Sequence, residues 1–355
     1  MVSLTMGIDP TKCFELTADR CIGDGEPCFV IAEIGSNHNH DFDLAKQTID
    51  AAAAARVDAV KFQTFRAASH YSKLAPGFSY LNDCNTFELI KALELDRSWH
   101  EPLKAYAESR GLVFLSSPCD VEAVSELHRL GTSALKIASF DLSDLHLIDQ
   151  VARTGRPVIL STGLADWMEI QRAVDACRAV GNDNIVLLQC TSLYPAPASL
   201  SNLRAIRTMR DAFGVLTGYS DHTEGDHVCL AAVALGACVI EKHITMDRKL
   251  PGPDHAFAME PEPLKQMMQR LRDVEAAVGD GAKTGPRSEE REMFEKGRRS
   301  LHARCRIPKG EVIRREMVTS KRPGLGIQPY LIDVVVGRLA RCDIDEDQWI
   351  TWEMI

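Results

Sequence analysis

Short apolar runs alternate along the chain with longer segments in which apolar residues recur every three or four positions. The short runs are typical of buried strands, and the longer spacing is typical of amphipathic helices. Helical spacing is clearest over residues 43–56, 99–110, 121–130 and 167–180. The predicted strands are 29–34, 58–63, 112–116, 134–138, 157–161, 185–189, 215–218 and 238–241.

This alternation of strand and helix predicts an α/β fold, a closed parallel (β/α)8 barrel or TIM barrel. A doubly wound open sheet is the alternative, but such a sheet would not so readily bring the ends of all its strands to one site. The link between the second and third strands is unusually long. Its turn-rich part, residues 67–85, predicts an inserted loop over the barrel mouth.

The composition changes after a helix predicted at residues 263–278. A turn-rich stretch follows and leads into a charged segment, and the rest of the chain consists of short β-like runs interrupted by glycine and proline. We therefore predict a catalytic barrel in residues 1–281, a linker in 282–297 and a small β-rich domain in 298–355.

Composition and charge narrow the class of protein. With 45% hydrophobic and 26% charged residues, the chain resembles an ordinary globular protein. A net charge of −9 argues against broad binding of nucleic acid or anionic membrane, yet leaves room for a local basic pocket that holds an anionic metabolite. The 11 cysteines form no CxxC pair, which predicts reduced thiols. The N-terminus lacks a signal-peptide pattern and residues 229–240 are too short to span a bilayer, so a cytoplasmic protein is expected.

Polar and charged residues stand where the predicted strands end. In a (β/α)8 barrel the carboxyl ends of the strands converge on one face, where active sites are built. Buried strands have no structural use for such groups, so their presence favours a function. The residues at these ends are Glu33, Lys61, Gln63, Ser116, Ser117, Lys136, Ser139, Ser161, Gln189, Ser220, Asp221, His222, Glu241 and His243.

Two of these residues, His222 and His243, follow successive strands and can approach one another. Two imidazoles, with water and oxygen ligands completing the shell, suit Mn²⁺ or Mg²⁺ in an open catalytic site. The alternative is that both histidines make ordinary hydrogen bonds. Glu33 is a candidate to orient a water molecule or to transfer a proton, and its alternative role is that of a salt-bridge partner.

A second group of residues combines positive charge with hydroxyl donors, which together favour a phosphate ligand. Its members are Lys61, Lys136, Ser139, Ser161, Ser192 and Ser220. Each serine alone is more typical of a turn or a cap, and either lysine could pair with Glu33 or Asp141. A Schiff-base lysine is a further alternative, which the two neighbouring histidines disfavour.

An ordered series of motifs resembles the sialic acid synthase family, which comprises N-acetylneuraminate, legionaminate and pseudaminate synthases. The resemblance covers nearly the whole chain, and the segment from Arg299 to Gly324 resembles the family's small antifreeze-like (SAF) domain. The motifs are Ala32-Glu33-Ile34-Gly35-Ser36-Asn37-His38-Asn39, Val60-Lys61-Phe62-Gln63-Thr64, Leu135-Lys136-Ile137-Ala138-Ser139, Leu160-Ser161-Thr162-Gly163, Cys190-Thr191-Ser192-Leu193-Tyr194-Pro195, Ser220-Asp221-His222, Glu241-Lys242-His243 and Gly252-Pro253-Asp254-His255.

The resemblance implies an enzyme that condenses phosphoenolpyruvate with an N-acylated amino-hexose, either N-acetylmannosamine or a diacetamido-trideoxyhexose. The expected products are a nine-carbon 2-keto-3-deoxy acid and phosphate. It also implies that His222 and His243 bind the divalent metal, that Glu33 positions the attacking water, and that the lysine and serine group binds phosphoenolpyruvate. Gln63, Tyr194 and Asp254 are looser candidates for the sugar side of the site.

The chain departs from the family pattern after Ser139. Many sialate synthases have a Gly-Glu pair there, whereas this chain has Phe140-Asp141, which is closer to the pseudaminate synthases. In contrast, the segments 252–255 and 257–261 favour sialate- or legionaminate-like relatives, so the sugar stays open. Asp141 keeps a carboxylate that is one methylene shorter, so a catalytic role in proton transfer would need a shifted backbone or a bridging water. The resemblance further implies a domain-swapped homodimer in which Arg322 of the tail reaches the partner's sugar; the alternative for Arg322 is a surface salt bridge.

Two other functions compete with this interpretation. One is a different phosphoenolpyruvate–aldose condensing synthase, of the Kdo or DAHP type, which the distinctive tail disfavours. The other is a noncatalytic ice- or carbohydrate-binding module, which the strand-end residues disfavour. Release of phosphate would separate an enzyme from a binding module.

Overall fold

The computed structural model describes residues 12–78 and 85–355. The last part of the predicted inserted loop, residues 79–84, lies outside the described residues. The chain divides into two compact units, one ending at Gly279 and the other running from Asp280 to Ile355. The predicted site residues other than Arg322 all belong to the first unit.

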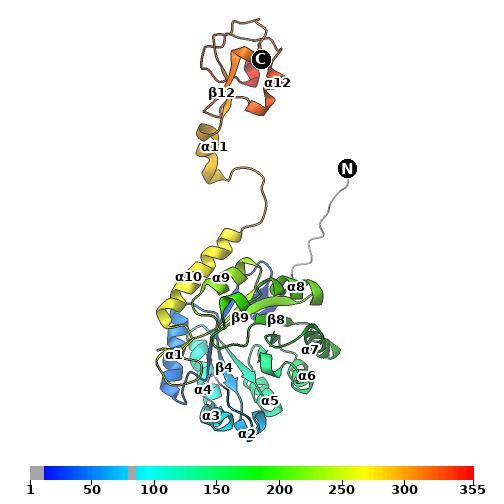
Figure 1. Ribbon diagram of the computed structural model, residues 1–355, viewed down its shortest axis with the longest axis vertical. Coiled ribbons are helices and arrows are strands. Elements are labelled where there is room, and N and C mark those ends of the chain that lie inside the picture. Colours follow the sequence, from blue (N-terminus) through cyan, green and yellow to red (C-terminus); the bar gives the residue numbers. More distant parts are fainter. Residues whose placement is uncertain (1–11, 79–84) are drawn as a thin grey trace. The chain divides into compact units, whose positions relative to one another are not determined.

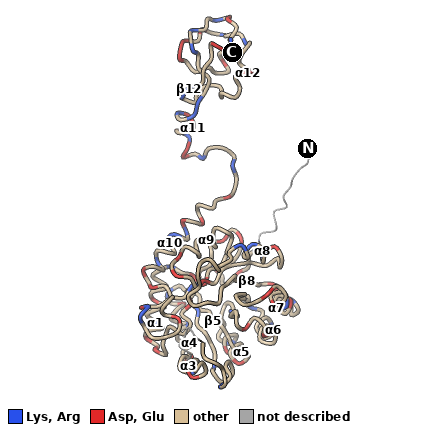
Figure 2. The backbone as a smooth tube through the Cα atoms, in the orientation of Figure 1, with Lys and Arg blue, Asp and Glu red and all other residues tan. Residues whose placement is uncertain are grey.

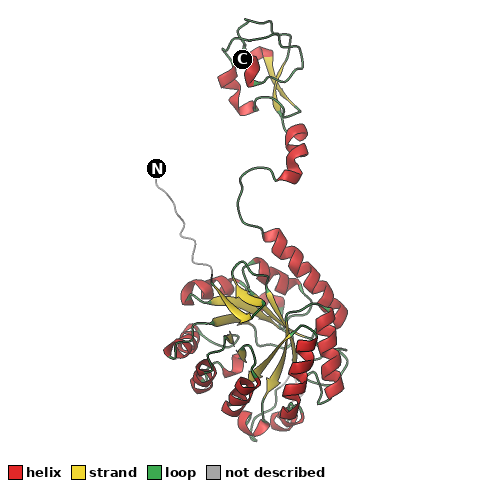
Figure 3. Cartoon of the chain, turned by 180° about the vertical axis from the view of Figure 1, so that it is seen from behind, coloured by secondary structure: helices red, strands yellow, loops and turns green. Residues whose placement is uncertain are grey.

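The first unit is built on a closed barrel of parallel strands in the order β10-β3-β4-β5-β6-β7-β8-β9 (Figures 1 and 3). This confirms the predicted (β/α)8 barrel. Most of its strands are buried along their whole length, as expected for a sheet covered on its outer face by helices. The strands are β3 (Phe29–Gly35), β4 (Ala59–Thr64), β5 (Val113–Pro118), β6 (Leu135–Ile137), β7 (Val158–Ser161), β8 (Ile185–Cys190), β9 (Leu216–Asp221) and β10 (Val239–His243).

Helices surround the barrel, and several begin at an aspartate that accepts hydrogen bonds from their first free N–H groups. Asp120 caps α5 in this way, and Asp166 forms a capping box with Glu169 at the start of α7. The barrel-side helices are α1 (Phe42–Ala54), α2 (Ala67–His70), α3 (Thr86–Ala92), α4 (His100–Ser109), α5 (Val121–Leu130), α6 (Leu145–Arg153), α7 (Trp167–Ala179), α8 (Arg204–Phe213), α9 (His227–Ala234) and α10 (Pro261–Val278), with short 3₁₀ turns η2 (Arg97–Trp99), η3 (Ser139–Asp141) and η4 (Ala198–Leu200).

An antiparallel hairpin precedes the barrel and was not predicted from the sequence. It consists of β1 (Cys13–Thr17) and β2 (Arg20–Gly23). Its apolar residues Leu16 and Ile22 are buried in the cluster that includes Phe29 and Val239, the first residues of two barrel strands. The hairpin therefore covers the amino-terminal end of the barrel, on the side away from the strand ends that carry the predicted site.

The second unit has a small core of its own. Strands β11 (Ser300–Ala303) and β12 (Val318–Lys321) pair in antiparallel register, and isolated bridges join further extended segments. Leu301, Ile313 and Ile350 are among its fully buried residues. Its helical elements are η5 (Ser288–Glu290), α11 (Arg291–Gly297), η6 (Arg315–Met317), η7 (Pro329–Leu331), α12 (Ile332–Val335) and η8 (Trp352–Met354).

Surface charge and hydropathy are unremarkable over residues 12–78 and 85–355. Basic and acidic residues are interspersed along the barrel helices (Figure 2). Within those ranges, every helix is too short or too polar to cross a membrane.

Candidate active site

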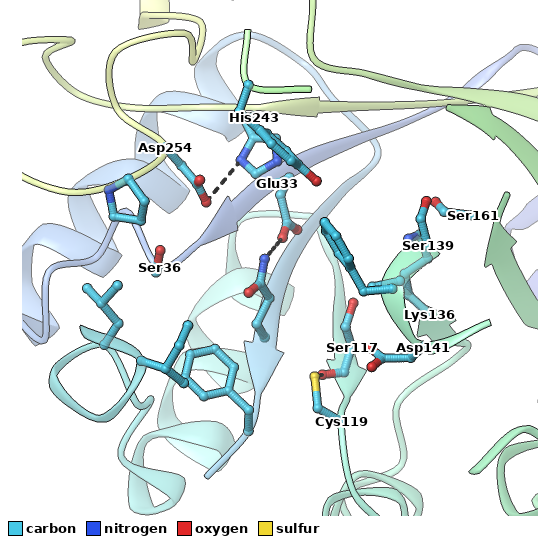
Figure 4. A pocket seen from close by; sticks show the side chains of 18 of the residues that line it. Glu33, Ser36, Ser117, Cys119, Lys136, Ser139, Asp141, Ser161, His243 and Asp254 are labelled. Carbon is cyan, nitrogen blue, oxygen red and sulfur yellow. Dashed lines mark hydrogen bonds and ion pairs between the residues drawn. The ribbon is translucent and has the colours of Figure 1, made fainter. Parts of the chain in front are cut away.

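A pocket at the carboxyl-terminal mouth of the barrel collects all the residues predicted to act in catalysis, substrate binding or metal binding except Ser192 and Arg322 (Figure 4). Of the other strand-end residues, Ser116, Gln189 and Asp221 do not line it. In the close-up, Lys136, Ser139 and Ser161 lie together on one side, and Glu33, His243 and Asp254 lie on the other. The predicted site residues that line the pocket are Glu33, Lys61, Gln63, Lys136, Ser139, Asp141, Ser161, Tyr194, Ser220, His222, His243 and Asp254.

Strand register brings Glu33 to the centre of this arrangement. Glu33 on β3 pairs with Lys61 on β4 on one side and with His243 on β10 on the other. The backbone then turns at Gly35, which has a φ of 54°. A Cβ atom at Gly35 would lie 3.1 Å from both Gln63 Nε2 and Glu33 Oε1. Glycine therefore permits both the left-handed turn and the close approach of the chain to these side chains.

Two buried lysines and two buried carboxylates form one network in the pocket floor. Lys61 Nζ lies 2.7 Å from Glu33 Oε2 and 3.8 Å from Glu241 Oε2, and Lys136 Nζ lies 3.5 Å from Glu241 Oε1. Ser220 Oγ also donates to Glu241, at 3.1 Å. The pairing of Lys61 with Glu33 was one of the alternatives raised from the sequence. Glu241 had been placed at the mouth but given no role, because its two lysine partners come from other strands.

The two carboxyl groups in this network differ in acidity. Burial raises the pKa of Glu33 to about 7, against a smaller lowering by the Lys61 ammonium. Burial also acts on Glu241, but Lys136 and Lys61 together hold the pKa of that carboxyl below its ordinary value. Glu241 is therefore a permanent anion, whereas Glu33 can exchange a proton near neutral pH.

The serine side of the pocket presents hydrogen-bond donors without acceptors. The hydroxyls of Ser161 and Ser192 are buried and have no hydrogen-bond partner among the described residues. A Cβ atom at Gly163 would lie 2.5 Å from Ser192 Oγ and 2.9 Å from Ser139 Oγ, so the missing side chain leaves space between these hydroxyls. Buried unpaired donors are costly unless a ligand satisfies them. With Lys136 beside them, they fit a small anion.

The two predicted metal ligands face each other. The ring centroids of His222 and His243 are 5.4 Å apart, and the ring of Tyr194 lies 4.4 Å from that of His222. His222 Nδ1 lies 2.9 Å from the carbonyl oxygen of Thr191; donation to that oxygen fixes the ring and leaves Nε2 as the free nitrogen. Burial holds the pKa of His243 well below its ordinary range, so this imidazole is neutral. Neutral imidazoles are the form that binds metal ions. At His222, burial lowers the pKa, but the neighbouring Cys190 and the carbonyl of Thr191 raise it above its ordinary value, so metal binding there displaces a more tightly held proton.

The donor set fits an open metal site rather than a closed structural one. Within residues 12–78 and 85–355, no cluster of three or more His, Cys, Asp or Glu side chains is arranged to hold a metal ion. The carboxyl group of Asp254 lies beside His243, with 3.7 Å between Asp254 Oδ2 and His243 Nδ1. Burial raises the pKa of Asp254 to about 6. A divalent ion on His222 and His243 would therefore take most of its ligands from water and substrate oxygens.

Another part of the pocket wall is apolar and comes mainly from the segment inserted between β4 and α4. Asp141 also lines the pocket, with His70 and Tyr71 from the insert, and burial raises its pKa. Among the described lining residues, Lys61 and Lys136 are the only lysine or arginine side chains. Sequence reasoning predicted an insert over the mouth but not its apolar surface, which consists of Phe65, Phe78, Leu89, Ile90 and Leu93, with Phe140 from η3.

Arg322 lies in the second unit, directly after β12. Its side chain is exposed and makes no hydrogen bond or ion pair with any other described residue. The predicted contact of Arg322 with a sugar in a second subunit stays a prediction.

A closed (β/α)8 barrel whose mouth joins an anion cradle to a pair of facing imidazoles is the arrangement of an enzyme. The chain belongs to the NeuB family, that of the sialic acid synthases: the family model matches residues 48–283, and the SAF domain model matches residues 298–355. This confirms the resemblance, the fold and the assignment as a synthase-type enzyme.

The relatives agree with this assignment over nearly their full length. The chain is 40% identical over 328 residues to the N,N'-diacetyllegionaminic acid synthase of Campylobacter jejuni, covering 90% of this chain and 98% of that protein. It is also 40% identical over 342 residues to the enzyme of the same name from Legionella pneumophila, covering 94% and 96%. The solved structure of the N-acetylneuraminic acid synthetase from Leptospira borgpetersenii, in complex with citrate, has a TM-score of 0.73 at 33% identity, covering 80% of this chain and 96% of that one.

Proposed function

We propose that this enzyme condenses phosphoenolpyruvate with the open-chain form of an unphosphorylated N-acylated amino-hexose. The products are a nine-carbon 2-keto-3-deoxy acid and inorganic phosphate. The observation that carries the proposal is the pair of buried, unpartnered hydroxyls of Ser161 and Ser192. Ser161 lines the same pocket as Lys136 and the imidazoles of His222 and His243, and Ser192 Oγ lies 2.5 Å from the position that a Cβ atom at Gly163 would take.

Phosphoenolpyruvate binds through the lysine and serine side of the pocket. Its phosphate accepts hydrogen bonds from Ser161 and Ser192 and takes its countercharge from Lys136, while Lys61 and Ser220 serve the remaining oxygens. Glu241 keeps both lysines charged and oriented until the ligand arrives, since it lies within 4 Å of each ammonium group. Ser139 stays near the phosphate because its Oγ accepts a hydrogen bond from Gly163 N, at 3.0 Å.

His222 and His243 would hold Mn²⁺ or Mg²⁺, which when bound would act as a Lewis acid and make the aldehyde carbon of the sugar more electrophilic. The bond between C3 of phosphoenolpyruvate and that carbon then forms, and positive character develops at C2. The aldehyde oxygen takes up a proton and becomes a hydroxyl. Water adds to C2 and gives up a proton; the C2–O bond to phosphate then breaks, and the new C2 hydroxyl loses its remaining proton and becomes the keto oxygen. Glu33 accepts the proton of that water, a role that suits a buried carboxyl with a pKa of about 7. Asp141 is the second proton-transfer group.

The apolar wall and the sparse cations of the pocket support an acylated and unphosphorylated acceptor. Acyl methyl groups bury apolar area against the insert and the half-exposed ring of Phe140. A sugar phosphate would need a second anion site, and the described lining residues offer Lys61 and Lys136, which phosphoenolpyruvate occupies. Gln63, Tyr194 and Asp254 serve the polar groups of the sugar.

The test is an incubation with phosphoenolpyruvate and a panel of acceptors, followed by a phosphate assay and the mass of the product. The panel contains N-acetylmannosamine, diacetamido-trideoxyhexoses and phosphorylated aldoses. We expect phosphate release and a nine-carbon acid with at least one unphosphorylated N-acylated sugar. Turnover with phosphorylated aldoses alone would contradict the proposal and favour a synthase of the Kdo or DAHP type. Sugar binding without phosphate release would favour a binding protein.

We also propose that the protein is a domain-swapped homodimer that acts in the cytoplasm. In this arrangement the SAF domain of one subunit completes the sugar site of the other. Arg322 is the residue proposed to reach the sugar, because its guanidinium is exposed and unpaired among the described residues. A tethered domain reaches a high effective concentration at a neighbouring barrel mouth.

Arg322→Ala is expected to raise the sugar KM by roughly tenfold or more, the effect of losing one charge-assisted hydrogen bond of about 1.5–3 kcal/mol. Phosphoenolpyruvate binding should not change. Mixing this variant with a Lys136→Met variant should restore activity, because subunit exchange creates one site with both residues. Arg306→Ala is the control, since this exposed arginine of the same domain already pairs with Asp343. A strictly monomeric protein, or an Arg322→Ala variant with an unchanged sugar KM, would contradict the proposed role.

A further inference from the structure

A buried ion pair joins the two strands that carry the facing histidines. Asp221 Oδ2 and Lys242 Nζ are 2.6 Å apart, and their side chains are 0% and 2% exposed. Asp221 directly precedes His222, and Lys242 directly precedes His243. The two residues are also register partners where β9 pairs with β10. The ion pair therefore lies one residue before the histidine on each of the two strands.

The pair lies on the opposite side of the barrel wall from the pocket. Successive side chains of a strand point to opposite faces, so the histidines face the mouth while Asp221 and Lys242 face the helices. Neither Asp221 nor Lys242 lines the pocket, and Cys229 of α9 contacts Asp221 Oδ2 through its Sγ at 3.1 Å. The pair has no access to substrate, and any effect on the reaction must pass through the histidines.

The same pair also holds the residue that follows His222. Thr223 donates to Asp221 from its backbone N–H, at 2.9 Å, and from its Oγ1, at 3.1 Å. Lys242 Nζ donates in turn to the carbonyl oxygen of Thr223. The chain on both sides of His222 is thus tied to the residue before His243. With Nδ1 of His222 directed at the carbonyl oxygen of Thr191, little freedom is left for this imidazole.

Stability alone gives a weak reason for this arrangement. The desolvation of a buried ion pair offsets much of its Coulombic gain, and a well-packed apolar pair of similar volume is often as stable. Backbone hydrogen bonds of the parallel ladder already join β9 to β10. The ion pair adds a geometric constraint, because the hydrogen bonds of Asp221 and Lys242 fix the positions and directions in which β9 and β10 end.

We propose that Asp221 and Lys242 are positioning residues that set the spacing and direction of His222 and His243 for a divalent metal ion. The proposal rests on the metal assignment within the proposed function. Partners that orient metal ligands typically contribute roughly 10- to 100-fold to metal affinity.

The test is the affinity for Mn²⁺, measured from the electron paramagnetic resonance signal of free Mn²⁺ in titrations of the full-length protein without substrate. The variant is Asp221→Asn/Lys242→Gln, which removes both charges and keeps hydrogen-bonding groups of similar size. We expect the Kd for Mn²⁺ to rise roughly 10- to 100-fold. The control is Arg20→Gln/Asp58→Asn, which neutralises another ion pair of 2.6 Å, between β2 and the residue preceding β4. It should leave the Mn²⁺ affinity unchanged.

Each outcome decides the proposal. A folded Asp221→Asn/Lys242→Gln protein with wild-type Mn²⁺ affinity overturns the positioning role alone, as does an equal loss in the Arg20/Asp58 control. If the double variant does not fold, Asp221→Glu replaces it: the charge is kept but the carboxylate is displaced by one methylene, and weaker Mn²⁺ binding is again expected. Wild-type protein that binds no Mn²⁺, or a His222→Ala variant that binds it unchanged, overturns the metal assignment itself and this proposal with it.

Discussion

Replacing His222 or His243 by alanine is expected to lower kcat by about a thousandfold, since Lewis-acid stabilisation of developing charge is worth several kcal/mol and each 1.4 kcal/mol is tenfold in rate. The two imidazoles face each other at 5.4 Å between ring centroids and belong to different strands, so each variant leaves only one nitrogen ligand. Chelation of the wild-type protein should produce a similar loss, and Mn²⁺ or Mg²⁺ should reverse it.

The measurement is phosphate release at saturating phosphoenolpyruvate and sugar, with metal-depleted protein titrated with each ion. His128→Ala is the matched control, because His128 is exposed near the end of α5 and does not line the pocket. It should behave as the wild type does. Full activity of a rigorously metal-free His222→Ala/His243→Ala protein would show that the reaction does not use a metal at this site.

The barrel could be predicted because its strands are buried on both faces. Apolar runs such as 29–34 and 185–189 therefore stand out from the amphipathic helices, and the structure places β3 and β8 within one residue of these ranges. The end of β9 was harder to predict. Its last residues, from Tyr219 to Asp221, are fully buried yet partly polar, so a pattern based on hydropathy ends the strand too early.

The candidate site was predictable to the extent that it depends on strand ends. Residues at the carboxyl ends of parallel strands must converge, so a lysine, a serine and a histidine in those places can be grouped without knowing their contacts. Partner choice could not be predicted. Glu241 lies between Lys61 and Lys136, and Asp221 lies against Lys242, because of strand register, which the sequence of one strand does not contain.

The segment inserted between β4 and α4 is a second case in which the contacts could not be predicted from the sequence. Its turn-rich sequence predicted a loop over the mouth, but the contribution of Leu89 and Ile90 to the pocket wall depends on how α3 folds back towards the barrel. Likewise, the hairpin of β1 and β2 has too few apolar residues to be recognised alone. Leu16 and Ile22 are meaningful only once the open end of the barrel they cover is known.

Replacing Glu33 by glutamine is expected to lower kcat/KM by roughly 10²- to 10⁴-fold, the range typical of a lost general base. Glutamine has nearly the same shape and can still accept the hydrogen bond that Gln63 Nε2 donates, at 2.8 Å in the wild type. The variant therefore keeps the size of the side chain but removes proton transfer together with the charge that faces Lys61 Nζ at 2.7 Å. Glu275→Gln is the control, since that carboxylate lies in α10, pairs with Arg272 and does not line the pocket.

The proposed role of Glu33 as a base also predicts the direction in which kcat/KM changes with pH. The unprotonated carboxylate is the form that accepts a proton, and burial raises the pKa of Glu33 to about 7. Wild-type kcat/KM, which reports the free enzyme, should therefore fall as the pH drops through about 7 and level off above it. Asp254, with a pKa of about 6, titrates in both proteins, so the difference between the two profiles isolates Glu33. A folded Glu33→Gln protein that keeps the wild-type rate, or the same limb near pH 7, would exclude Glu33 as the base. In that case Asp141, another carboxyl group that lines the pocket, would be the next group to test.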